Sequence, residues 1–397
     1  MTDNATTARH IRLWHKDFWK ISAVNLFTAL SVYMLLPVLP LWLSSRLSMS
    51  PLQVAIAMAA PGVGVFLFGS MCSFLVQKYR RNKVCITAMA LLAATIVAIT
   101  YVADSATLIE ELQLTFASVL VLRLLTGAFF GLAYLVLNST LVVDCCETAE
   151  RTLANIVSAW CYRLAMVGGP LIGLLLWHEV GAQNVFYVSA ALCLVSAATL
   201  WSVNFPFKAP EETVRTFSFD RFLLPSSMAL SVPVAVVSAS LVLVMLSPLT
   251  VANSVFLIIG LLAAIPVQHI ALNGVGRGWR VFGAAALLIA SAVLSFFGGN
   301  VILAATARII FAFAAALIVC NLHYALTETA DHCQRGTAQS TFVLFSEFGV
   351  AVGVLLYLIP LTSTATDIAE VVLALSILAA LCLALFTKRF IARKVKD

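Results

Sequence analysis

A polar pattern occurs twice in this apolar chain, in 144-DCCETAERTLANIVSAWCYRLAMVGG-169 and 328-ETADHCQRGTAQSTFVLFSEFGVAVG-353. An offset of 184 residues aligns the two stretches. The matched pairs are Asp144 and Glu328, Glu147 and Asp331, Arg151 and Arg335, Arg163 and Glu347, and Gly169 and Gly353. Upstream, Arg123 is matched by Arg308 at an offset of 185. A parallel duplication in an apolar chain predicts two equivalent helical bundles with a pathway between them.

The composition is that of a membrane protein. Hydrophobic residues make up 62% of the 397 positions, charged residues only 11%, and the mean hydropathy is +1.02. A soluble domain of this length needs more charged surface. Apolar runs of a length that spans a bilayer as helices number twelve. We expect them near 20–43, 52–76, 84–103, 113–138, 152–177, 183–203, 227–247, 251–272, 281–298, 300–324, 338–361 and 367–387.

The basic residues predict the orientation of these spans. Of the 24 Lys and Arg residues, 20 fall at the two ends of the chain or in even-numbered connections. Only Arg46 lies in an odd-numbered connection. The positive-inside rule therefore predicts a multi-pass protein of the plasma (inner) membrane with both termini in the cytoplasm. The net charge of +6 follows from this topology and from contact with the lipid bilayer, so we expect no nucleic-acid partner.

The expected fold is an all-α membrane protein with twelve transmembrane helices in two pseudo-symmetric six-helix bundles. We place the bundles at 1–203 and 227–397, joined by a polar, proline-containing cytoplasmic linker at 204–226. The sequence has no nucleotide-binding loop, metalloprotease motif or nucleophile elbow, so we do not expect an enzyme. The nine cysteines lack metal-ligand spacing, and we expect neither a metal nor a cofactor. A monomer is expected.

Four motifs resemble those of the major facilitator superfamily, and within it the drug:proton antiporter branch. Leu36-Pro37-Val38-Leu39-Pro40 looks like the branch signature at the end of helix 1. The segment from Arg123 to Gly131 is similar to the R-x-x-x-G motif of helix 4. Gly169-Pro170-Leu171-Ile172-Gly173 looks like the antiporter G-P-x-x-G motif of helix 5. With the topology, the resemblance covers essentially the whole chain.

The fourth motif departs from the family pattern. The loop from Ser73 to Lys83 stands where the family has G-x-x-x-D-R-x-G-R-K. Ser73 replaces the glycine and Gln77 the aspartate, while Lys78, Arg81 and Lys83 keep the basic character. In the family this acid latches the cytoplasmic side shut. The resemblance here implies a latch in which a hydrogen bond from Gln77 takes its place.

Arg163 and Glu347 are equivalent positions with opposite charge. Each lies 12 residues into its helix from Arg151 or Arg335, which is about 18 Å at the helical rise. Charges at that depth usually face a cavity or a partner. We expect both to line the substrate pathway, either sensing each other or binding opposite ends of a substrate. The alternative is a fixed structural ion pair or separate contacts to backbone carbonyls.

A polar stripe is predicted on the fourth helix. The spacing of Arg123, Gly127, Gly131, Tyr134 and Asn138 puts all five on one helical face. The glycines allow close helix packing. The resemblance implies a role for Arg123 in proton coupling, and the alternative is a hydrogen bond to backbone that supports the fold.

Other polar residues inside the predicted helices complete the candidate substrate cavity. They are Asn25, Tyr33, Tyr162, Arg308 and His323. Proton coupling needs a group that titrates during the cycle, and Glu347 is the carboxylate placed deepest within a span. Asp17, at the start of the first helix, is a reserve candidate. Many antiporters of the branch carry an acid within helix 1, whereas this helix has only neutral polar residues there.

Candidate gate residues cluster at the predicted cytoplasmic ends and at the helix-5 motif. They are Gln77, Arg81, Asp144, Glu147, Arg151, Glu328, Asp331, Arg335, Gly169 and Pro170. We expect the charged ones to form contacts that hold the inner gate. Gly169 and Pro170 supply the bend or close packing that rocking of the two bundles requires.

The sequence predicts a secondary transporter that exports a small amphipathic organic solute by proton antiport and alternating access. Three intramembrane arginines against one glutamate favour an anionic or zwitterionic solute. One alternative is a proton-coupled or facilitative importer of a metabolite. Another is a membrane sensor or lipid-handling scaffold that does not transport, in which Arg163 and Glu347 would be buried in dry protein.

Overall fold

The computed structural model describes residues 13–106, 112–147, 150–205, 215–218, 222–247, 249–272, 277–297, 300–330, 334–359 and 365–386. Within these ranges all regular secondary structure is helical. The elements are α1 (Lys16–Tyr33), α2 (Leu35–Leu47), α3 (Pro51–Gly64), α4 (Gly69–Lys78), α5 (Arg81–Ala106), α6 (Leu112–Val136), the π-helix η1 (Leu137–Leu141), α7 (Val142–Asp144), α8 (Arg151–Val180), α9 (Ala182–Trp201), α10 (Pro225–Leu246), α11 (Val251–Leu272), α12 (Arg277–Leu294), the 3-10 turn η2 (Ser295–Phe297), α13 (Val301–Thr329), α14 (Arg335–Leu358) and α15 (Ala365–Phe386).

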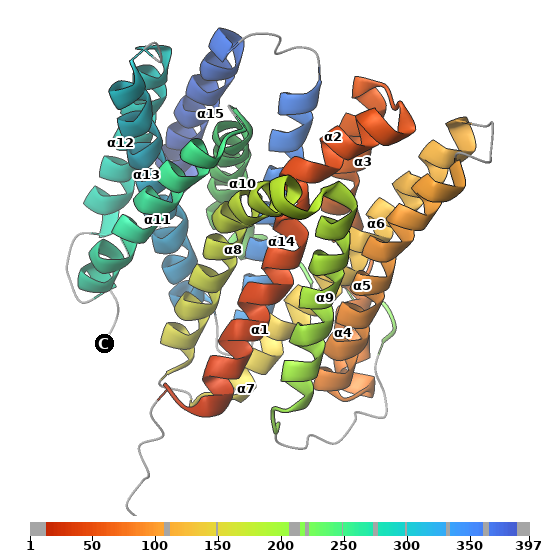
Figure 1. Cartoon of the computed structure of the whole chain (residues 1–397). Coiled ribbons are helices and arrows are strands. Elements are labelled where there is room, and N and C mark those ends of the chain that lie inside the picture. Colours follow the sequence, from red (N-terminus) through yellow and green to blue (C-terminus); the bar gives the residue numbers. More distant parts are fainter. Residues whose placement is uncertain are drawn as a thin grey trace, which may run out of the picture.

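These helices supply the expected number of membrane spans. In the described part of the chain, eleven segments are long and apolar enough to cross a membrane, with α1 and α2 counted together. The bent pair α3–α4 makes a twelfth. In Figure 1 α1 begins and α15 ends at the lower end of the bundle. We call it the basic end, because α5, α8, α12 and α14 all begin there with an arginine.

The second predicted span, 52–76, is present but bent, and it consists of α3 and α4. α3 and α4 are inclined by 43° to each other. The four residues between them are held by short-range backbone bonds, among them Leu67 N to Gly64 O at 2.9 Å. Upstream, Pro61 has no amide hydrogen for the carbonyl of Ala57, one helical turn earlier. That free carbonyl accepts a bond from Arg123 Nε at 3.2 Å instead.

The contacts between helices repeat from the first half of the chain to the second. α1 packs on α8 and α9, and α10 packs on α14 and α15 in the same way. The α5–α6, α5–α9 and α3–α6 contacts recur as α12–α13, α12–α15 and α11–α13. Between the halves, α3 packs on α14 and α11 packs on α8, again an equivalent pair. The fold is thus two pseudo-symmetric helical bundles, as expected; the domain boundaries proposed from the sequence stay a prediction.

The described part of the linker is attached to both halves. Ser218 N donates to Ser70 O in α4 at 3.1 Å. Phe222 is only 3% exposed and meets Phe66 edge to face, with ring centroids 6.1 Å apart. A Cβ on Gly69 would stand 1.7 Å from the Phe222 ring, so only glycine leaves room for it. Two residues later, Leu224 N donates to Thr341 Oγ1 of α14 at 2.8 Å.

Two linker phenylalanines allow a matched test of this attachment. We expect Phe222→Ala to lower the free energy of unfolding by about 3 kcal/mol, because it empties a packed aromatic site. Phe217→Ala should change it by less than about 0.5 kcal/mol, since Phe217 is 64% exposed. Thermal and denaturant unfolding of the purified protein in one detergent measures both. Equal effects would contradict a structural role for Phe222.

Candidate functional site

Glu347 is held by two phenols from the other half of the chain. Tyr33, the last residue of α1, donates from Oη to Glu347 Oε1 at 3.0 Å. Tyr162 of α8 donates to the same oxygen. The two phenol oxygens are themselves 2.6 Å apart. We call these three residues the Glu347 ring, and all three side chains are buried.

Local sequence explains how Tyr33 reaches this position. Pro37 has no amide hydrogen to bond the Tyr33 carbonyl, so α1 stops at Tyr33 and α2 begins at Leu35. α8 then approaches α1 closely at this break. A Cβ on Gly169 would lie 2.7 Å from Tyr33 Cβ. The glycine of the antiporter-like motif therefore sets the distance at which Tyr33 stands from α8.

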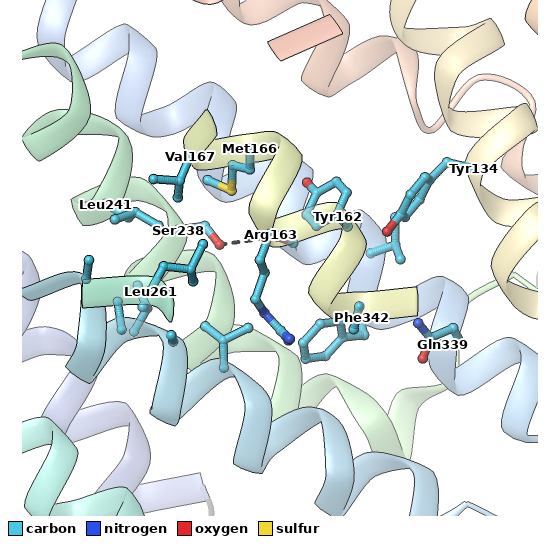
Figure 2. A pocket seen from close by; sticks show the side chains of 18 residues that line it. Tyr134, Tyr162, Arg163, Met166, Val167, Ser238, Leu241, Leu261, Gln339 and Phe342 are labelled. Carbon is cyan, nitrogen blue, oxygen red and sulfur yellow. Dashed lines mark hydrogen bonds between the residues drawn. The ribbon is translucent and has the colours of Figure 1, made fainter. Parts of the chain in front are cut away.

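A cavity lies between the halves beside the Glu347 ring. We call it the Arg163 chamber; it contains about 650 Å³ of empty space, its opening included. Its walls come from α6 and α8 on one side and α10, α11, α13 and α14 on the other. Figure 2 shows Arg163 extending from α8 into it beside Phe342. Along α14 its lining runs from Gln339 to Ser346, just before Glu347.

Arg163 is a buried cation in that chamber. Its side chain is 7% exposed, and it makes no hydrogen bond or ion pair with the described residues. The guanidinium lies 5.7 Å from the centroid of the Trp160 ring, a favourable cation–π contact. Trp160 Nε1 in turn donates to Gln268 Oε1 of α11 at 2.6 Å. Arg163 and Glu347 do not form an ion pair.

A second cavity lies on the other side of the ring and reaches toward the opposite end of the bundle. It is lined by Tyr33, Arg123 and Glu347, among others, and we call it the Arg123 chamber. Along α14 its lining continues from Glu347 to Val354. A further apolar cavity beyond it shares Leu36, Met58 and Val354 with it. The Glu347 ring therefore separates a chamber with Arg163 from one with Arg123.

The polar stripe of α6 packs on α3. Arg123 donates to Ala57 O, as described above, and a Cβ on Gly127 would lie 2.1 Å from Pro61 O. Arg123 thus makes the backbone contact expected under the structural alternative, and it also lines a cavity with Glu347. Tyr134, further along the stripe, lines the Arg163 chamber, and its ring lies 4.9 Å from that of Tyr162.

The asparagine pair forms a separate buried cluster. Asn25 Nδ2 donates to Asn138 Oδ1 at 3.0 Å and to Ser158 O at 3.1 Å, and Ser158 Oγ bonds both asparagines. Neither asparagine lines the three cavities described here. The cluster sits on the π-helix η1, where three successive side chains donate hydrogen bonds to backbone carbonyls one turn earlier. They are Asn138 on Tyr134 O, Ser139 on Leu135 O and Thr140 on Val136 O.

Three other predicted residues lie outside the two chambers. His323 is buried, and its Nε2 is 2.5 Å from Oε1 of Gln339, which does line the Arg163 chamber. Arg308 is half-buried near the start of α13 and donates to Ala304 O at 2.9 Å. Asp17 lies in the first turn of α1, 3.7 Å from Lys20 Nζ, with its side chain 38% exposed.

The candidate gate residues gather at the basic end. Arg81 Nη1 and Asp144 Oδ2 form an ion pair at 2.5 Å. Glu147 and Glu328 are exposed, and Asp331 lies outside the described residues. Gln77 makes no hydrogen bond within the described part of the chain. The hydrogen bond expected to replace the family latch is therefore missing there.

Arg151 and Arg335 occupy equivalent places as the first residues of α8 and α14. In each, Nε is buried without a hydrogen-bond partner among the described groups. Pro170 is buried inside α8, where its missing amide leaves the carbonyl of Met166 without its helical partner. Met166 lines the Arg163 chamber.

Several contacts at this site were missed by the sequence reasoning. Ser238 and Ser346, 3.2 Å apart, line the Arg163 chamber together with Phe342. The Trp160–Gln268 bond joins the two halves. No motif marks these residues. A signal existed only for Gln268, one of few polar residues in a mostly apolar span.

Comparison with known proteins agrees with this architecture. Residues 21–252, more than half of the chain, match the model of the Major Facilitator Superfamily. The chain belongs to this superfamily of multi-pass membrane transporters. No curated protein sequence matches the chain. The drug:proton antiporter branch stays a prediction.

Solved structures with the same fold are distant in sequence. A bacterial homologue of the iron transporter ferroportin, in an outward-facing state, has a TM-score of 0.68 at 14% identity, covering 96% of this chain and 100% of that one. A bacterial ferroportin homologue in an outward-facing state with soaked iron gives 0.68 at 12% identity, covering 95% and 99%. An auto-inhibited peptide transporter of the POT family gives 0.67 at 13% identity, covering 96% and 98%. At these identities the likeness concerns the fold alone.

Adjacent glycines in α8 test how the Glu347 ring is positioned. Gly169→Ala should lower the free energy of unfolding by about 1–3 kcal/mol, because the new methyl overlaps Tyr33. Gly168→Ala is the matched control, since a Cβ there has nothing within 4 Å. Its helix propensity should make it neutral or slightly stabilising. Unfolding of both variants in the same detergent checks this, and an unaffected Gly169→Ala protein would contradict the contact.

Proposed function

We propose that the chain is a proton-coupled exporter of a small amphipathic organic solute that works by alternating access. Glu347 carries the proton, and the Arg163 chamber holds the solute. The superfamily supports transport of a small solute. Proton coupling and outward direction rest on the residues described above and on the topology expected from the basic residues.

The hydrogen count in the Glu347 ring is the observation that carries this proposal. Three oxygens make three mutual contacts, and each hydrogen bond needs one hydrogen. The two phenols supply only two hydrogens. A protonated Glu347 supplies the third and completes a closed ring, whereas an ionised Glu347 leaves two oxygens in contact without a hydrogen. Loss of the proton therefore removes the hydrogen from the Tyr33–Tyr162 contact, and both phenols then donate to the ionised carboxylate, so the bonds that join α14 to α1 and α8 change with the protonation state of Glu347.

The two chambers offer separate routes to this acid. The Arg123 chamber connects Glu347 toward the end opposite the basic one, which the expected topology places outside the cytoplasm. Protons would reach Glu347 from that end. The solute would bind in the Arg163 chamber, on the other side of the ring. Tyr33 and Tyr162 lie between the two chambers, so their contact would couple the protonation of Glu347 to the binding of the solute. Arg163 and Glu347 each line a cavity. This supports a transporter over the non-transporting scaffold, in which both residues would be buried in dry protein.

A conservative substitution tests the coupling acid. Glu347→Gln keeps the size and polarity of the side chain but cannot release a proton. In proteoliposomes loaded with anionic, zwitterionic and cationic candidates, an imposed pH gradient should drive uphill transport by the native protein only. Exchange of solute without a gradient should persist in the variant.

Tyr33→Phe should reduce gradient-driven transport by breaking the ring, with Tyr101→Phe as control because Tyr101 is 64% exposed. If Glu347→Gln still transported uphill at the native rate, another group would carry the proton. Solute accumulating on the side with the higher proton concentration would support export against protons. Movement of solute together with protons would favour the importer.

A designed disulfide tests alternating access at the basic end. There α14 packs on η1, and a Cβ on Gly336 would lie 3.7 Å from Ser139 Cβ. That separation matches the roughly 3.8 Å typical of a disulfide. Oxidising the Ser139→Cys, Gly336→Cys double variant should abolish transport, and reduction should restore it. Each single variant is the control, and undiminished transport by the cross-linked protein would exclude opening between these helices.

A further inference from the structure

The Arg163 chamber contains one charged side chain. The polar residues of its lining are Arg163, Tyr134, Tyr162, Ser238, Gln339 and Ser346, and the other lining residues are apolar. Arg163 is the cation, and no carboxylate lines the same space. The described residues give its guanidinium no anionic partner, and a buried charge without a partner is costly. An anion entering the chamber would remove that cost.

Several other polar groups of the chamber already have hydrogen-bond partners. Ser238 and Ser346 are in hydrogen-bond contact, and Gln339 Oε1 is bonded to His323. Glu347, the nearest acid, accepts bonds from both phenols, and Tyr162 lies on the chamber side of it. The chamber thus offers no acidic group to hold an ammonium. Among charged groups, it is suited to a single anionic one.

The remaining lining is apolar and closely spaced. Leu241, Leu261 and Phe342 face Met166 and Val167 across the chamber (Figure 2). Mostly apolar walls with a few polar groups are typical of sites for small organic molecules. Such walls bind an apolar body and exclude a second charge.

We infer that the solute is an organic monoanion, a carboxylate or sulfonate on a compact apolar or aromatic body, with Arg163 as its charge-binding residue. This inference rests on the proposed function, and it separates the anionic class from the zwitterionic and cationic classes. Arg163 donates two parallel bonds to the anionic group, as guanidinium groups do with carboxylates. Phe342 and the leucines contact the body.

A matched series of probes tests the class by binding alone. The probes are 3-phenylpropionate, 3-phenylpropionamide, 3-phenylpropylamine and phenylalanine, which present one aromatic body as an anion, a neutral amide, a cation and a zwitterion. Affinity is measured by titration calorimetry on the purified full-length protein in detergent, without any gradient. The carboxylate should bind about tenfold or more tightly than the other three, because the amide and the amine lose the charge-assisted bond to Arg163, and the zwitterion must bury an ammonium without a partner.

Variants then assign the preference to Arg163. Arg163→Gln should bring the affinity for the carboxylate down to that for the amide. Arg163→Lys should keep a reduced preference, since it retains the charge but loses the planar fork. Arg46→Gln is the control, because Arg46 is exposed on α2. It should leave the order of affinities unchanged.

Three results would overturn the inference. The first is an amine or zwitterion that binds the native protein as tightly as the carboxylate. The second is a preference for the carboxylate that survives Arg163→Gln. The third is failure of every carboxylate to bind when the series is extended from phenyl to naphthyl and branched alkyl bodies. None of these readouts involves proton transfer, so the Glu347→Gln experiment can fail while this one succeeds, and the reverse.

Discussion

A carboxyl group in the middle of a membrane must be hydrogen-bonded, and here both of its partners come from the opposite half of the chain. Tyr33 and Tyr162 belong to the first bundle and Glu347 to the second, so the hydrogen bonds of this one carboxyl group join the two bundles. In apolar surroundings, water can replace such a hydrogen bond only if a water-filled cavity reaches the carboxyl group. The arrangement of chambers on either side follows from this single connection.

Close helix packing makes that connection possible. Gly169 in α8 lets the end of α1 approach, and Pro37 ends α1 at the residue whose phenol is needed. In the second half, Gly349 and Gly353 let α14 approach α10 in the equivalent place, with Cβ positions 2.1 Å from Ala235 O and 2.5 Å from Ala239 O. The duplication has therefore preserved the backbone packing while the side chains at the centre diverged from Arg163 to Glu347.

The membrane spans and their duplication could be predicted from the sequence, because hydropathy and the order of charges are local properties. So could the depth of Arg163 and Glu347, since a helix rises by a fixed amount per residue. The partners of Glu347 could not. Tyr33 is 314 residues away from it, and its phenol points there only because of the α1 break and the glycine of α8. The bend at 65–68 and the burial of Phe222 were missed for the same reason, as each depends on a packing partner distant in sequence.

The linker limits how far the bundles can separate at the basic end. Phe222 is inserted against α4 of the first bundle, and the amide of Leu224 is bonded to α14 of the second. Two residues of fully extended chain span at most about 7 Å. Any wider opening must withdraw the aromatic ring from the first bundle or break the bond to Thr341. The segment between the bundles thus acts as a tether of fixed length. A closed and a widely opened basic end would then differ in the burial of the Phe222 side chain.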